Sequence, residues 1–160
     1  MTGIWAIDCA EEHPNAEVIG TDLSPIQPTW VPPNAKFYVD DVEDTWVWQP
    51  DEKFDLIHGR ALSGGIQDWV KMYKQAYKHM QPGAWIEMQE YETWILSNEG
   101  DMSKTPNLQS WLEKVNEASL KHGKELNEAP RQKQNLIEAG FINVHDEVKK
   151  VHQSWAVTKH

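Results

Sequence analysis

The stretch Ala16-Glu17-Val18-Ile19-Gly20-Thr21-Asp22-Leu23-Ser24 decides the fold of this chain. Val18 and Ile19 form a short apolar, β-branched run, which is typical of a buried strand. Asp22 follows where the strand ends. Ligands of open parallel sheets bind beyond the carboxyl ends of the strands, and a carboxylate there can accept hydrogen bonds from both hydroxyls of a ribose. An Asp that caps the turn before Pro25 would also explain the pattern, so the surrounding residues must decide.

The composition limits the class of protein. A chain of 160 residues, 39% of them hydrophobic, predicts a single domain over residues 1–160. The net charge of -10 argues against binding to nucleic acid. Cys9 is the only cysteine and the seven histidines lack an HExxH pattern, so we expect no metal and no internal disulfide. Without an apolar run of about 18 residues or a leader-like start, we expect a cytoplasmic protein with no membrane partner.

Predicted strands and helices alternate along the chain. The hydrophobic spacing predicts helices over residues 2–12, 66–80, 107–124 and 131–139. It predicts strands over residues 16–21, 36–39, 54–58 and 84–89, and a last extended run from 141 to 151. Alternation with short connections indicates βαβ units, and hence an α/β fold with a mostly parallel sheet.

Three successive predicted strands end in polar residues: Asp22, Asp40-Asp41 and His58-Gly59-Arg60. Parallel strands end at the same rim of a sheet, so this pattern predicts a nucleotide-type site. There Asp22 would hold a ribose, Asp41 would accept from an adenine amine, and Val42 would give an apolar contact. His58 and Arg60 would line the far side. For each residue singly, a polar group satisfied by its own loop is the alternative.

The chain resembles the class I S-adenosylmethionine-dependent methyltransferases, and most closely their fungal LaeA-like branch. The resemblance extends from Thr2 to about Val151. The segments that carry it are Thr2-Gly3-Ile4-Trp5-Ala6-Ile7-Asp8, Val18-Ile19-Gly20-Thr21-Asp22-Leu23-Ser24-Pro25-Ile26-Gln27-Pro28, Asp40-Asp41-Val42-Glu43-Asp44, Phe54-Asp55-Leu56-Ile57-His58-Gly59-Arg60 and Pro82-Gly83-Ala84-Trp85-Ile86-Glu87.

The resemblance implies a Rossmann-like sheet with helices on both faces and S-adenosylmethionine as cofactor. Asp22 would bind the ribose, Asp41 and Val42 the adenine, and Gly3 would close the glycine-rich turn under the methionine part. Leu23 and Arg60 belong to the same expected cofactor-binding set.

The chain departs from the family pattern at both ends. Family members enter this region through an apolar strand and a Gly-x-Gly-Thr-Gly turn, of which only Thr2-Gly3 is present, and they continue into a further hairpin. We therefore expect a sheet that lacks the first strand and the last hairpin. The remaining strands would close into a smaller sheet, or a second copy would fill the gap in a homo-oligomer, for example a homodimer, or the chain is a fragment.

These observations predict a methyltransferase-like protein of fungal secondary metabolism that acts on a small molecule. Methyl transfer needs positioning of the acceptor and sometimes a general base, for which His58 and Glu90 are the candidates. The alternative is a protein without methyl transfer, either a cofactor-independent cyclase or isomerase or a regulatory scaffold. The resemblance also leaves a nuclear location open.

Overall fold

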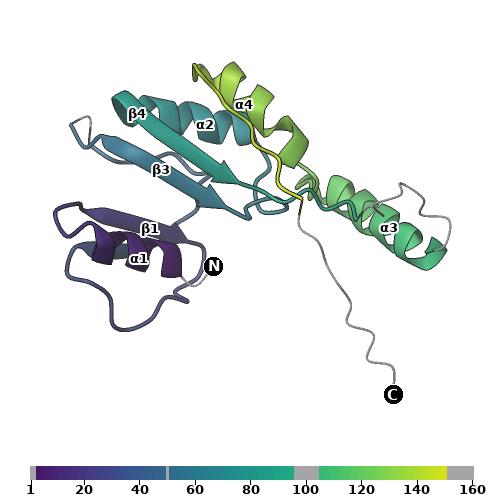
Figure 1. Ribbon diagram of the computed structural model, residues 1–160, viewed down its shortest axis with the longest axis horizontal. Helices are drawn as coiled ribbons and strands as arrows, with labels where there is room; N and C mark the ends of the chain where they lie inside the picture. Colours follow the sequence, from purple (N-terminus) through teal and green to yellow (C-terminus); the bar gives the residue numbers. More distant parts are fainter. Residues whose placement is uncertain (1–2, 50, 96–104, 151–160) are drawn as a thin grey trace.

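The computed structural model describes residues 3–49, 51–95 and 105–150. Strands and helices follow one another in an α/β pattern (Figure 1). In chain order the elements are α1 (Ile4–Glu12), β1 (Val18–Asp22), β2 (Ala35–Val39), β3 (Phe54–Arg60), α2 (Trp69–Lys78), β4 (Met80–Gln89), α3 (Pro106–His122), the 3₁₀ helix η1 (Ala129–Arg131) and α4 (Gln132–Ala139). The predicted α/β class is thus confirmed.

The first sheet consists of β1 and β2, which run parallel from the pair Val18–Ala35 to the pair Asp22–Val39. Gly20 lies opposite Phe37. A Cβ atom on Gly20 would lie 2.6 Å from Cδ1 of that ring, so only glycine leaves the ring its place. Helix α1 packs against both strands, and it buries Ile7 and Ala10 there.

The second sheet consists of β3 and β4, also parallel, with His58 opposite Glu87 and Arg60 opposite Gln89. Side chains alternate between the two faces of a strand. Ile86 and Met88 face the core under α2 and α4, whereas His58 faces α1, where its ring stacks on Trp5. Helices therefore cover both faces of the strands, as predicted.

Among the described residues, β1 and β3 are paired on one edge only, so the strands form two two-stranded sheets and not a single smaller one. The expectation that the remaining strands close into one smaller sheet is therefore wrong for the described part of this chain. Figure 1 shows β1, β3 and β4 with their arrowheads directed the same way. An unpaired strand edge leaves backbone N–H and C=O groups available to another strand.

Side-chain hydrogen bonds join the loop after β2 to α2 and to the turn that precedes it. One carboxylate oxygen of Glu43 accepts the N–H groups of Gln67 and Asp68, each at 2.9 Å, just ahead of α2. The side chain of Gln75 accepts from the Trp46 N–H at 2.9 Å and donates to the Asp44 carbonyl at 2.8 Å. These hydrogen bonds tie the loop to α2 and the turn before it. Since α2 packs on the second sheet, the loop is also fixed relative to that sheet.

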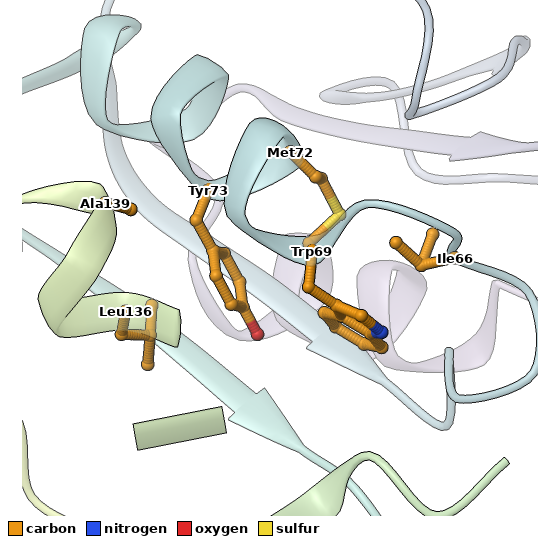
Figure 2. Close-up of a cluster of buried hydrophobic side chains, with 6 residues drawn as sticks. All are labelled: Ile66, Trp69, Met72, Tyr73, Leu136 and Ala139. Atoms are coloured by element: carbon orange, nitrogen blue, oxygen red, sulfur yellow. The ribbon is translucent and has the colours of Figure 1, made fainter. Parts of the chain in front are cut away.

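The core lies between α2, α4 and the second sheet (Figure 2). Tyr73 is completely buried there, and its hydroxyl donates to the side-chain oxygen of Gln132. The other buried members come from α2, α4 and the turn before α2: Ile66, Trp69, Met72, Leu136 and Ala139.

Helix α2 is shorter than the predicted helix over 66–80. It begins after Asp68, whose carboxylate caps it by accepting from the Lys71 N–H at 2.9 Å. It ends before His79, and Met80 already pairs with Phe54 at the start of β4. Ile66 and Met80 are apolar because they pack, not because they are helical, which is why the spacing overextended the helix at both ends.

The other predicted helices and strands are present within about two residues at their ends, the usual uncertainty of helix and strand limits, with one exception. The strand predicted over 84–89 begins four residues earlier, because β4 already pairs with β3 from Met80. The predicted extended run from 141 to 151 is not a strand over residues 141–150, and Val151 lies outside the described residues, as does Thr2 of the first predicted helix. None of the described helices is long and apolar enough to cross a lipid bilayer.

Candidate functional site

The carboxyl ends of β1 and β2 bring two acidic residues together. The N–H of Asp40 donates to the carbonyl of Asp22 at 3.0 Å, so the two residues are neighbours at one rim. The Asp22 carboxylate accepts from the N–H of Ser24 at 3.0 Å. This hydrogen bond is the main cause that lowers the pKa of Asp22, and the carboxylate is therefore ionised at neutral pH.

The loop that follows β2 places Asp41 and Val42 next to this rim. The Asp41 carboxylate accepts from the N–H of Glu43 at 2.9 Å and so fixes the turn. Val42 is half-buried against the core, and its carbonyl accepts the indole N–H of Trp46 at 2.9 Å. Leu23, directly after Asp22, leaves 64% of its surface exposed and gives this rim an apolar side chain open to a ligand.

Gly3 caps the N-terminus of α1 in a left-handed conformation, with a φ of 76°. A Cβ atom at this position would lie 2.8 Å from Cε1 of Phe37 and 3.1 Å from Cγ of Gln27. The close approach to Gly3 is therefore made by this chain's own Phe37 ring. The glycine is required by packing as well as by the turn.

His58 lies near the carboxyl end of β3 and is held from two directions. Its Nδ1 lies 2.9 Å from a carboxylate oxygen of Glu87, and its ring stacks on Trp5 with 3.8 Å between ring centroids and an interplanar angle of 10°. The His58 side chain is only 5% exposed. Arg60, two residues further along, ends β3 opposite Gln89 and is half-buried.

Glu90 follows β4 directly and is tied to the loop after β3. One of its carboxylate oxygens accepts from the N–H of Leu62 at 2.8 Å, and the other accepts from the N–H of Ser63 at 3.0 Å. Both oxygens thus hold the backbone of the loop after β3 next to the end of β4. A carboxylate engaged in this way positions the loop, and only the remaining lone pair of each oxygen is left to accept a proton.

Two open cavities lie away from these residues. The larger, of about 610 Å³, lies beside α2 and is lined by residues that include Trp46, Lys71, Lys74 and Lys78. The smaller, of about 310 Å³, lies among the start of α2, the end of α3 and α4. None of the residues predicted for the nucleotide-type site lines either cavity. The described residues contain no group of three or more side chains arranged to hold a metal ion.

The rim of the first sheet fits one half of S-adenosylmethionine. The ionised Asp22 carboxylate suits a ribose diol, and Asp41, Val42 and Leu23 place acidic and apolar groups beside it. On the methionine side the space beside Gly3 is filled by Phe37. The residues present thus fit the adenosine part better than the amino-acid part.

Two residues that hold His58 were not predicted from the sequence: Trp5, which stacks on it, and Glu87, which bonds to it. The sequence indicates only that Trp5 belongs to the apolar side of α1, and not that it contacts His58. Glu87 is opposite His58 because of the strand register, which a single sequence does not encode locally.

Parallel strands with helices on both faces define an α/β protein, and in this chain acidic residues lie at the carboxyl ends of β1 and β2. A family model described as a methyltransferase domain matches residues 1–145. The chain belongs to this methyltransferase-domain family. Proteins with such a domain in general depend on S-adenosylmethionine.

Similar proteins are fungal. The chain is 39% identical over 141 residues to "Methyltransferase pytC" of Aspergillus terreus, an alignment of 88% of this chain and 43% of that protein. It is 35% identical over 162 residues to "Secondary metabolism regulator LAE1" of Cochliobolus heterostrophus, with 99% of this chain and 52% of that protein covered. It is 35% identical over 149 residues to "Secondary metabolism regulator laeA" of Monascus pilosus, with 92% and 40% covered. The chain thus spans about half the length of these relatives or less.

Proposed function

We propose that this chain is an S-adenosylmethionine-dependent methyltransferase domain of fungal secondary metabolism that acts on a small-molecule acceptor. The observation that carries the proposal is the ionised Asp22 carboxylate at the end of β1, adjacent to the Asp40–Val42 loop. The cofactor supplies an activated methyl group when it is bound. In this arrangement Asp22 accepts from the ribose hydroxyls, and Asp41, Val42 and Leu23 surround the adenine.

The remaining predicted site residues are proposed to contact the cofactor or to act as the base. In the proposal Gly3, at the start of α1, lies toward the methionine part, and Arg60, at the end of β3, lines the far side of the site. His58 is the proposed base toward the acceptor, because its imidazole is held in a fixed orientation. Glu90 is the second candidate, with the restriction that both of its oxygens also hold the loop after β3.

Heat unfolding in the presence of S-adenosylhomocysteine tests the proposal. A ligand that binds only the folded state stabilises it by mass action, by about 2.7 kcal/mol at 100 times its Kd. We expect the melting temperature of the wild type to rise, that of Asp22→Ala to stay unchanged, and that of the control Asp8→Ala, altered on the exposed side of α1, to rise as in the wild type. No rise at millimolar ligand would overturn the proposal.

We further propose that the chain self-associates. The observation in support is that β1 and β3 each leave one edge without a partner strand among the described residues. Light scattering after size exclusion should then give a multiple of the 18.5 kDa chain mass. A stable interface has a Kd below about 100 µM, so the oligomer would be populated at that concentration. A mass of one chain at every concentration up to this value would therefore contradict self-association.

A regulatory role without methyl transfer is the second candidate function. It is favoured by the names of the relatives from Cochliobolus heterostrophus and Monascus pilosus, which call them secondary metabolism regulators, and by Phe37, which fills the space beside Gly3. Under this candidate the protein works in the cytoplasm or the nucleus. It predicts no thermal shift with S-adenosylhomocysteine, so the same experiment separates the two functions.

A further inference from the structure

The ring of His58 has a buried nitrogen that nothing in the described part of the chain uses. Its Nδ1 contacts Glu87, whereas its Nε2 is buried and has no hydrogen-bond partner among the described residues. A buried polar atom without a partner destabilises the folded state, because it has lost its hydrogen bonds to water without replacement. Most buried polar atoms in folded proteins have a partner, so this nitrogen needs an explanation.

The neighbours of the imidazole decide which nitrogen carries the proton. Gln89 donates to one oxygen of Glu87 at 3.0 Å, and His58 contacts the other. These two hydrogen bonds lower the pKa of Glu87, which is therefore an ionised carboxylate at neutral pH and can only accept. The proton of the neutral imidazole must then be on Nδ1, and Nε2 must carry a lone pair.

The ring is also fixed in orientation. The contact of Nδ1 with Glu87 on the neighbouring strand opposes rotation of the imidazole about its Cβ–Cγ bond. The stack on Trp5 opposes tilting of the ring plane. Trp5 comes from α1 and Glu87 from β4, so two separate elements fix one side chain on a third. Preorganisation of this kind is what a group that accepts a proton in a defined direction requires.

We propose that Glu87 is a positioning residue that holds the His58 imidazole in the Nδ1–H form, and that Nε2 is thereby reserved as the acceptor for an O–H or N–H group of the methyl acceptor. The role toward the acceptor rests on the proposed function, whereas the protonation state depends only on this chain. The proton moves from the acceptor's oxygen or nitrogen to Nε2, and Glu87 stabilises the imidazolium so formed without becoming protonated.

The test is a nitrogen NMR spectrum of the full chain with ¹⁵N-labelled histidine at about pH 8, above the usual imidazole pKa of about 6.5. The signals of His58 are identified by their loss in His58→Phe. We expect protonated Nδ1 and unprotonated Nε2 in the wild type, and a shift of the proton toward Nε2 in Glu87→Ala. The matched control Glu92→Ala, which removes a carboxylate from the exposed chain after β4, should leave the wild-type pattern.

A wild-type spectrum with the proton on Nε2 overturns the inference without recourse to any variant, and so does an unchanged pattern in Glu87→Ala. Binding of S-adenosylhomocysteine is measured on the same samples and should be equal in the wild type and in Glu87→Ala. If Nδ1 is protonated but S-adenosylhomocysteine does not bind, the proposed function and the role of Nε2 toward a methyl acceptor are overturned. The positioning of His58 by Glu87 would still hold in that case. Weaker binding in Glu87→Ala alone would place the pair at the cofactor and contradict a role of Nε2 toward the methyl acceptor.

Discussion

Tyr73 of α2 is completely buried, and its hydroxyl donates to Gln132 of α4. Burial, with the charges of Glu90 and Glu128 as smaller causes, raises the pKa of Tyr73 far above its usual value, so the hydroxyl keeps its proton. The bond joins two helices across the core. Gln132 is itself buried, so removal of the hydroxyl leaves its side-chain oxygen without this partner.

Tyr73→Phe should therefore lower the free energy of unfolding by about 1–3 kcal/mol, the cost of a buried polar group left unpaired. Urea unfolding measures this as a lower midpoint with an unchanged slope. The control Tyr77→Phe alters a ring that is 54% exposed, and it should change stability by less than about 0.5 kcal/mol. Equal effects of the two substitutions would contradict a stabilising hydrogen bond between Tyr73 and Gln132.

The carboxyl of Glu87 should titrate below its value in the unfolded chain, which is about 4.3, because Gln89 and His58 donate to it. A lowered folded-state pKa means that its contribution to stability is present above the unfolded value and is lost as the pH falls through the folded value. The side chain is half-exposed, so this contribution is small. Carbon NMR should show the pKa of Glu87 rising in Gln89→Ala, and a pKa that does not move would show that Gln89 has no influence on it.

At the level of the elements, the first sheet depends on a glycine opposite an aromatic ring. Gly20→Ala would place a methyl group against Phe37, and overpacking of this kind costs about 1–3 kcal/mol. The double variant Gly20→Ala/Phe37→Leu should recover part of the loss, because the smaller side chain makes room for the methyl. Unfolding experiments on the double-mutant cycle measure this coupling.

Gly83→Ala is the matched control for this cycle. Nothing lies within 4 Å of the added methyl there, but the φ of 86° makes an alanine strained, with a cost of about 1–2 kcal/mol. This loss should be the same with Phe37 or Leu at position 37. A loss in Gly20→Ala that Phe37→Leu does not relieve would show that the ring does not limit the space.

The stack of Trp5 on His58 joins α1 to β3, where no backbone pairing connects the two sheets among the described residues. Trp5→Leu should therefore speed hydrogen exchange in α1, β1 and β2 more than in β3 and β4, since the first sheet loses a contact with the second. Trp30→Leu is the control, because that ring is 70% exposed. Uniform acceleration over both sheets would mean that the stack serves the fold as a whole.

For the molecule as a whole, the sequence predicts the order and type of the elements well, and their pairing poorly. Val18–Asp22 is recognisable as a strand because its apolar run ends at an acid. The division into two sheets and the pairing of His58 with Glu87 depend on contacts between distant segments. Local periodicity carries no information on such contacts.

The candidate site shows the same limit. Asp22 and the loop Asp41–Val42 were found because carboxylates at strand ends are a local pattern. The packing of Phe37 against Gly3 and the hydrogen bonds from the loop to Glu90 were not, since each depends on side chains from elsewhere in the chain. A residue type at a strand end therefore indicates a candidate site but does not indicate the partners of that residue.

The proposed adenosine site is the rim at the ends of β1 and β2, and the cavity beside α2, lined by residues that include Lys71 and Lys74, is the place to compare it with. Amide NMR spectra during titration with S-adenosylhomocysteine distinguish them. The shifts should be largest at the rim residues Asp22, Leu23, Asp41 and Val42 and small at both lysines. Largest shifts at the lysines, or none anywhere at millimolar ligand, would contradict an adenosine site at the carboxyl ends of these strands.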